Sequence, residues 1–111
     1  MFRNRAYNAP RRCSMPTYVV LSKWTNQGIQ SVKQSPSRLD AGRKAFEAAG
    51  VKMKDFYMVM GQYDMVIVVD APDDATLAKA TLSLASAGNI QTETLRAFTE
   101  DEYKKIVSGL A

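Results

Sequence analysis

The sequence of 111 residues predicts an α+β protein, a ferredoxin-like βαββαβ sandwich with an extra C-terminal helix. The first observation is that runs rich in β-branched and aromatic residues alternate with helix-like runs in that order. The second is that only Gly61-Gln62 separates the second and third strand-like runs, as in a hairpin. Two right-handed βαβ units joined by this hairpin give a four-stranded antiparallel sheet with two helices on one face.

The first half of the domain begins with an expected strand, Thr17–Trp24, which is dense in β-branched and aromatic residues. Thr25 can then cap a short helical segment. A longer helix follows, because Ser35 suits the N-cap and Pro36 suits the first helical position. We expect this helix to end at Ala49-Gly50, since glycine favours the left-handed backbone that terminates helices.

Two further strands are expected at Val51–Met60 and Tyr63–Asp70. A two-residue connection that starts with glycine favours a type II′ turn, because its first position requires a positive φ. The strand Tyr63–Asp70 is apolar on both of its faces, so it should lie inside a sheet that is covered on both sides.

The last third of the chain repeats the helix–strand pattern and then adds a helix. Pro72-Asp73-Asp74 opens a helix that should stop at Gly88-Asn89, and its acids suit the positive end of the helix dipole. Ile90–Phe98 is the fourth expected strand. Thr99 and Glu102 form a capping box for a final helix, whose apolar residues recur at helical spacing: Tyr103, Ile106, Val107 and Leu110.

Two helices can cover only one face of this sheet. The second and third strands carry apolar groups on both faces, so the other face is left to water, to the final helix or to another subunit. We favour another subunit, because apolar burial contributes about 25 cal/mol per Å² and the bare face is large. The prediction is a homodimer or a larger homo-oligomer, with the chain itself as its partner.

The net charge of +4 comes from four arginines near the N-terminus: Arg3, Arg5, Arg11 and Arg12. No acid precedes Asp40, and from Met15 onward 11 basic residues balance 11 acidic ones. Residues 1–14 have no apolar periodicity, so we predict a disordered basic tail there, ahead of a single domain at residues 15–111.

Three explanations of the tail stay open. Translation can begin at Met15 in the cell, the tail can be a solvated arm without a role, or it can contact phosphates or direct targeting. No apolar stretch follows Arg11-Arg12, as a secretory signal requires. The longest apolar run, Met65–Val69, is far shorter than the roughly 20 residues that span a bilayer. We therefore expect a cytoplasmic protein without a membrane partner.

The composition excludes several kinds of chemistry. The chain has no His and one Cys, so it offers no imidazole acid or base, no His-ligated metal or haem, and no internal disulfide. Its six glycines never form a phosphate-binding GxGxxG loop. A charge-balanced domain with an aliphatic central strand does not suit RNA binding through the sheet. We expect no metal, no cofactor and no nucleic-acid partner.

Several separated segments resemble the GYD-domain proteins, namely Met15-Pro16-Thr17-Tyr18, Lys23-Trp24-Thr25, Gly61-Gln62-Tyr63-Asp64 and Asn89–Tyr103. The resemblance covers Met15–Leu110. It implies membership of the dimeric α+β barrel superfamily, here as a small bacterial protein whose sheet packs face to face with a second sheet. The run Gly61–Asp74 is also similar to the effector-binding module of Lrp/AsnC-type regulators. That second resemblance implies binding of a small molecule where subunits meet.

Five side chains are candidates for a ligand-binding site: Trp24, Tyr57, Tyr63, Asp64 and Arg96. For Asp64 and Tyr63 the competing interpretation is structural, with the carboxylate fixing the turn and the phenol packing on the sheet. Arg96 lies on one face of an expected strand, so it should meet an anionic ligand or pair with an acid of this chain, the candidates being Asp64, Asp55 and Glu93. No catalytic residue is assigned.

Two functions compete, and whether the protein is an enzyme stays open. The first is a non-catalytic, homo-oligomeric module that binds a small molecule or drives assembly. The second is a cofactor-independent oxygenase or isomerase acting on a small aromatic or carbonyl substrate, as in other α+β barrel families. It would use Trp24, Tyr57, Tyr63 and Arg96, with Asp64 as a base. A closed cavity with converging polar groups inside one subunit would favour the enzyme, and a cavity between subunits the binding module.

Overall fold

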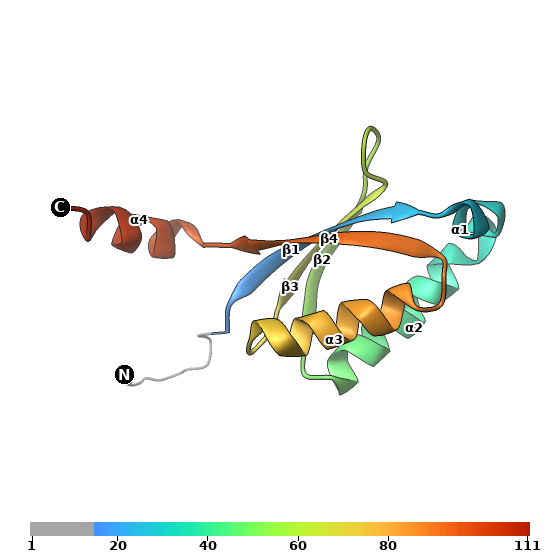
Figure 1. Cartoon of the computed structure of the whole chain (residues 1–111), viewed down its shortest axis with the longest axis horizontal. Helices are drawn as coiled ribbons and strands as arrows, with labels where there is room; N and C mark the ends of the chain where they lie inside the picture. The colour runs from blue at the N-terminus through green and yellow to red at the C-terminus, as the bar shows by residue number, and fades with distance from the viewer. Residues whose placement is uncertain (1–14) are drawn as a thin grey trace.

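The computed structural model describes residues 15–111, and the predicted tail at residues 1–14 lies outside the described residues. The elements in chain order are β1 (Thr17–Trp24), α1 (Asn26–Gln30), the 3₁₀ turn η1 (Val32–Gln34), α2 (Ser35–Ala48), β2 (Lys52–Met58), β3 (Met65–Asp70), α3 (Asp74–Ala85), β4 (Ile90–Ala97) and α4 (Glu100–Ser108). All strands pair antiparallel in the order β2-β3-β1-β4. The predicted ferredoxin-like sandwich with an extra C-terminal helix is confirmed (Figure 1).

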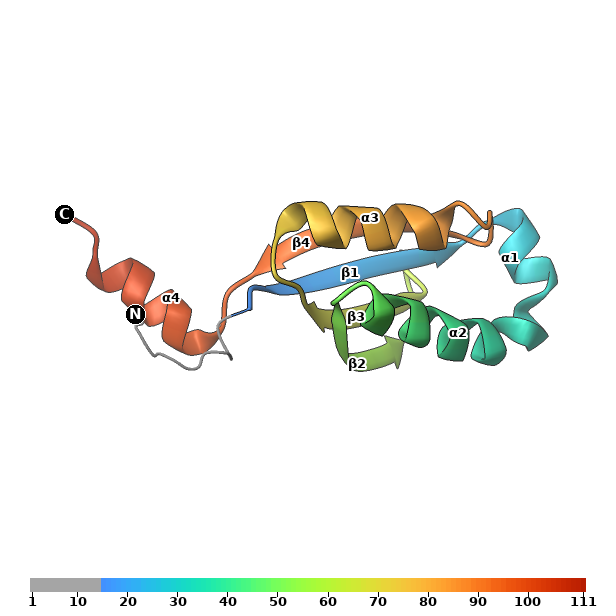
Figure 2. The ribbon, with the colours of Figure 1, turned by 90° about the horizontal axis from the view of Figure 1, so that it is seen from below.

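The core lies between one face of the sheet and the pair α2 and α3, which run side by side over that face (Figure 2). Every second residue of β1 and β3 faces these helices, which is why burial alternates along both strands. Register fixes the partners, with Tyr18 opposite Val69 and Val20 opposite Ile67. The buried cluster is apolar apart from one phenol: Tyr18, Val20, Phe46, Val51, Ile67, Val69, Ala71, Leu77 and Ala80.

The opposite side of the sheet, which we call the bare face, is covered by no element of residues 15–111 (Figures 1 and 2). Its apolar side chains come from all four strands and are only partly buried or exposed: Val19, Leu21, Tyr57, Val66, Val68 and Leu95. The predicted interior position of the third strand is confirmed, because β3 lies between β2 and β1. Figure 1 places α4 beyond the end of β4 and away from the sheet, so α4 of the same chain leaves the bare face open.

Local capping signals place the helix ends well, with one correction. Thr99 and Glu102 form the predicted capping box of α4. Gly50, just after the C-cap of α2, has the positive φ, +89°, that is expected where a helix ends. The prediction of Ser35 as an N-cap is wrong, because Ser35 is the first residue of α2 and Gln34 is the N-cap. The turn η1 leads directly into α2 with helical backbone angles, so Ser35 never takes the extended conformation that an N-cap serine needs.

The β2–β3 connection is longer than the expected two-residue turn. The ladder ends at the pair Met58 and Met65, so residues 59–64 form the connection, although Gly61 does have the predicted positive φ, +132°. The reason lies in Asp64, whose N–H donates to the Ser22 carbonyl at 2.9 Å. This bond joins the residue before β3 to β1. Beyond the last ladder pair, a hydrogen bond from Val59 N–H to the Asp64 carbonyl, 2.8 Å, links the two arms of the connection.

Candidate functional site

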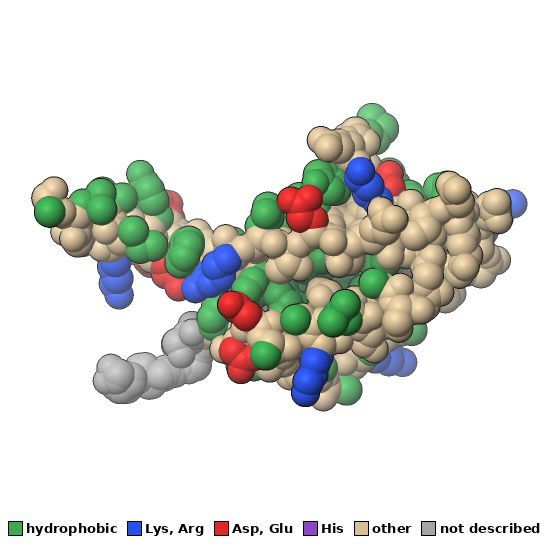
Figure 3. Space-filling model, in the orientation of Figure 1, with side chains coloured by type: hydrophobic (Ala, Val, Ile, Leu, Met, Phe, Trp, Pro, Cys, Tyr) green, Lys and Arg blue, Asp and Glu red, His purple; other side chains and the backbone are tan. Residues whose placement is uncertain are grey.

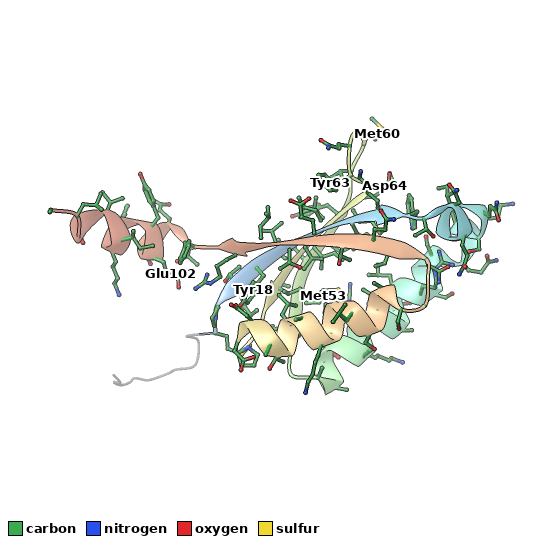
Figure 4. The ribbon with its side chains drawn as sticks, in the orientation of Figure 1. Tyr18, Met53, Met60, Tyr63, Asp64 and Glu102 are labelled. Atoms are coloured by element: carbon green, nitrogen blue, oxygen red, sulfur yellow. The ribbon has the colours of Figure 1, made fainter. Side chains whose placement is uncertain are left out.

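Tyr63 crosses one end of the bare face. Its hydroxyl donates a hydrogen bond to the Glu93 carboxylate of β4, and the Lys23 ammonium lies 5.4 Å from the centre of its ring. The hydrogen bond to Glu93 raises the pKa of the Tyr63 phenol. Since β1 separates β3 from β4 in the sheet, the contact between Tyr63 and Glu93 crosses β1. Figure 4 shows Tyr63 near the base of the hairpin. Its ring closes one end of the bare face with a polar group at the rim.

Asp64 has the structural role that competed with ligand binding. Its Oδ2 accepts a hydrogen bond from the Trp24 N–H at 3.0 Å. The carboxylate thus takes the place of a backbone carbonyl that a longer β3 would have offered to this N–H. Together with the bond from the Asp64 N–H to Ser22, it fastens the hairpin base to the end of β1. The tip of the hairpin then projects from the bare-face side, with Met60 92% exposed (Figures 1 and 4).

The remaining apolar surface of the bare face is accessible. Tyr57 is 58% exposed and Leu95 is 44% exposed, at opposite edges of the sheet, with the partly buried valines and Leu21 between them. Exposed apolar groups of this number on one sheet face mark an interaction surface more often than an accident of composition.

Arg96 is not paired with any of the three acids proposed for it. Its guanidinium donates to the backbone carbonyls of Thr17, at 3.3 Å, and Ala97, and it lies 4.3 Å from the centre of the Phe98 ring. It also lies 5.7 Å from the centre of the Tyr18 ring. The prediction of an acid partner failed because Arg96 lies on the helix side of the edge strand β4, opposite Tyr18, whereas Glu93 lies on the bare face. The alternative, an anionic ligand, stays a prediction.

Tyr18 lies at this same end of the sheet, where its hydroxyl donates to the Asp74 carboxylate at the start of α3. The hydrogen bond to Asp74, with burial as the second cause, raises the pKa of the Tyr18 phenol. This contact fastens β1 to α3, and it lies on the helix side of the sheet (Figure 4).

A cavity of about 690 Å³, partly open to solvent, lies on the helix side, between α2, α3 and the sheet. Of the five predicted site residues only Trp24 lines it. The floor includes Ser22, which is 0% exposed. The sequence could have pointed to Ser22, because it is a polar residue on the otherwise apolar inward face of β1, between Val20 and Trp24. Three methionines of β2 and β3 also line this cavity: Met53, Met58 and Met65.

The five predicted site residues therefore do not form one site. Tyr63 and Asp64 meet at the hairpin base, Tyr57 lies on the bare face, Arg96 lies near the start of β1, and Trp24 faces the cavity. The cavity lies inside one protomer, as expected for the enzyme, but the polar groups that were to do the chemistry do not converge in it.

Two features are absent from residues 15–111. No helix in that part of the chain is both long and apolar enough to cross a membrane. The same residues contain no group of three or more His, Cys, Asp or Glu side chains arranged to hold a metal ion.

Comparison with known proteins gives a family. A family model described as the GYD domain matches residues 18–107. A protein of Thermus thermophilus named glutamine synthetase and cystathionine beta-lyase binding protein is 43% identical over 84 residues, or 75% of this chain and 88% of that protein.

Two solved structures have a similar fold. The crystal structure of MtbAldR has a TM-score of 0.62 at 15% identity, over 85% of this chain and 59% of that one, and this likeness shows the fold alone. The crystal structure of TTHA0845 from Thermus thermophilus has a TM-score of 0.50 at 28% identity, over 77% of this chain and 95% of that one.

Proposed function

The chain belongs to the GYD-domain family, whose function is unassigned, and we propose that it is a non-catalytic binding module that acts as a homodimer. The observation that carries the proposal is the bare face, which has apolar side chains from all four strands. Burying such a face against a second copy removes it from water and forms the closed pair of sheets implied by the family resemblance.

The bare face alone is smaller than the surface that a stable dimer buries. Strands of six to eight residues, which rise about 3.3 Å per residue and lie about 4.8 Å apart, give a face of roughly 20 Å by 20 Å. That is about half of the roughly 800 Å² that each partner of a stable complex buries. The projecting hairpin tip and α4 supply further apolar surface, since Met60 and Leu110 are 92% and 71% exposed. Figure 3 shows hydrophobic side chains at both places.

A second copy is the occupant that best fits the charge of this domain. Residues 15–111 carry 11 basic and 11 acidic side chains, so two copies approach without net repulsion. The end of the bare face carries both signs, in Lys23 and Glu93. A two-fold pairing needs such a self-complementary surface, because each patch faces its own duplicate.

The dimer is tested by substituting one leucine on the bare face and one away from it. Leu95→Asp places a charge on the bare face, and Leu82→Asp places it on the exposed side of α3, where Leu82 is 70% exposed. Size-exclusion chromatography with light scattering should give a dimer for the unchanged protein and for Leu82→Asp, and a monomer for Leu95→Asp. A monomeric unchanged protein at micromolar concentration would disprove the dimer.

The partner class comes from the Thermus relative, which is named for binding glutamine synthetase and cystathionine beta-lyase. We extend that class, a folded metabolic enzyme, to this chain on the strength of 43% identity over 88% of the relative. Biolayer interferometry with purified glutamine synthetase and cystathionine beta-lyase should detect saturable binding by this chain. If neither enzyme binds at micromolar concentration while the chain is a well-formed dimer, the partner class is wrong and the dimer stands.

A further inference from the structure

We propose that the cavity between α2, α3 and the sheet is a binding site for a small apolar carboxylate. The site lies on the side of the sheet away from the bare face, so it does not depend on the dimer. Three observations carry the proposal: the size of the cavity, a buried hydroxyl in its floor, and the sign of the charges around it.

The size of the cavity is that of a ligand site. Its volume, about 690 Å³, lies within the roughly 300–1,000 Å³ typical of small-molecule pockets. The cavity is partly open to solvent, since residues along its mouth such as Ala45 and Lys79 are exposed. Small residues of the facing helices, and of the turns that follow them, keep it open: Ala41, Gly42, Ala45, Ala49, Ala80 and Ala87. The helices nevertheless touch at one point, because a Cβ on Gly42 would lie 3.3 Å from the Leu84 side chain.

Ser22 gives the cavity a specific polar contact. Its side chain is fully buried, lines the cavity and has no hydrogen-bond partner for its hydroxyl within residues 15–111. A buried hydroxyl without a partner is costly, and buried polar side chains in native proteins almost always have one. An oxygen atom of a bound molecule would be such a partner, and because the Ser22 hydroxyl has no exposed surface, that oxygen reaches it only when the side chains above it move aside.

The charges around the cavity are all of one sign. Arg38 and Lys79 are among its lining residues, and the lining contains no acid. Arg38 is held in place by carbonyls, through Nη1 to Ser31 at 3.1 Å and Nη2 to Gly28 at 3.3 Å. Lys79 forms no ion pair within residues 15–111. Two cations beside a mainly aliphatic and aromatic lining favour a ligand with an apolar body and one negative charge.

Trp24 makes binding measurable without a label, because it is the only Trp of the chain and it lines the cavity. The probes are decanoate, decan-1-ol and decylamine, each below its micelle concentration, followed by Trp fluorescence and by thermal shift. We expect decanoate to change the Trp emission and raise Tm, with a Kd at least tenfold lower than that of decylamine. Equal binding of decanoate and decylamine, or no binding of decanoate, would overturn the proposal.

Matched variants separate the cavity from the molecular surface. Ala80→Leu fills the cavity and should abolish decanoate binding, whereas Ala78→Leu on the exposed side of the same helix should not. Should Ala80→Leu fail to fold, Lys79→Glu still decides the question, because it changes only an exposed residue. It should weaken decanoate binding at least tenfold, with Lys33→Glu, which does not line the cavity, as the control.

Two further variants address the hydroxyl and the bare face. Ser22→Ala should weaken decanoate binding several-fold without lowering Tm, since it removes a donor that has no other partner. Leu95→Asp should leave decanoate binding unchanged, whatever it does to the dimer. Loss of decanoate binding in Leu95→Asp but not in Ala80→Leu would place the carboxylate on the bare face and overturn the cavity site.

Discussion

At the scale of single residues, Asp64 explains why a carboxylate stands at the base of this hairpin. The N–H of Trp24 lies at the end of β1, where no backbone carbonyl of β3 remains to accept its hydrogen bond. Asp64 supplies the acceptor from its side chain at 3.0 Å, while its own N–H donates to Ser22. The neighbouring Tyr63 is thereby aimed across β1 at Glu93. Asp64 and Tyr63 together therefore set the structure at one end of the bare face.

The variant Asp64→Ala should lower the free energy of unfolding by about 1.5–3 kcal/mol, the range for a hydrogen bond to a charged group. Urea denaturation followed by circular dichroism measures this loss. Asp64→Asn keeps an oxygen acceptor and should cost less. Asp55→Ala, at an exposed carboxylate of β2, is the matched control. If Asp64→Ala lowers the free energy of unfolding no more than Asp55→Ala does, the Asp64 carboxylate has no such structural role.

The residue-scale predictions succeeded where the chemistry of a short motif decides which group forms a hydrogen bond, and failed where the arrangement of the strands decides the partner. The role of Asp64 followed from turn chemistry, and the capping box of Thr99 from a spacing of three residues. The partner of Arg96 depended on which strand lies at the sheet edge, and the carbonyl of Thr17 lies 79 positions away. Ser22 was missed because one serine in an apolar strand does not by itself indicate a cavity.

At the scale of elements, the short helix α1 is fixed by its contact with the loop between α3 and β4. The Thr25 N–H donates to the Asn89 carbonyl at 3.0 Å, and its hydroxyl donates to the Gly88 carbonyl at 2.6 Å. Gly28 packs so closely on this loop that a Cβ there would lie 2.0 Å from the Asn89 carbonyl oxygen. The sequence predicted α1 from its N-cap, Thr25. The requirement for glycine at position 28 could not be predicted, because it comes from a loop about 60 residues further along the chain.

The variant Gly28→Ala should therefore be destabilising despite the better helix propensity of alanine. The added methyl group forces the loop away from α1, and overpacking of this kind costs about 1–3 kcal/mol or more. Differential scanning calorimetry should show a clear fall in Tm. Gly109→Ala, where the nearest atom to a Cβ is at 3.5 Å, should leave Tm nearly unchanged. Similar Tm values for the two variants would contradict the contact.

At the scale of the whole molecule, the two faces of the sheet have different fates. The helix side is closed by α2 and α3 around a core and a cavity, and the other side is left bare. The helix α4 extends past the sheet with its apolar residues in solvent, including Tyr103 at 59% and Ile106 at 51% exposure. Within residues 15–111 these side chains stay exposed. Two chains gain apolar contact if each α4 packs on its partner. The sequence alone does not suggest this contact, because it does not show where α4 lies relative to the sheet.

The variant Ile106→Asp tests that argument. Ile106 is exposed in the protomer, so the substitution should change the stability of an isolated protomer by no more than about 0.5 kcal/mol. In the proposed dimer it should nevertheless raise the dissociation constant at least tenfold, because it places a charge in a surface that we propose the partner covers. Sedimentation velocity over a dilution series measures this constant. Ile29→Asp is the matched control, since Ile29 is 48% exposed on α1 at the other end of the molecule. If both variants dimerise as tightly as the unchanged protein, α4 lies outside the interface, and the bare face and hairpin must supply all of the buried area.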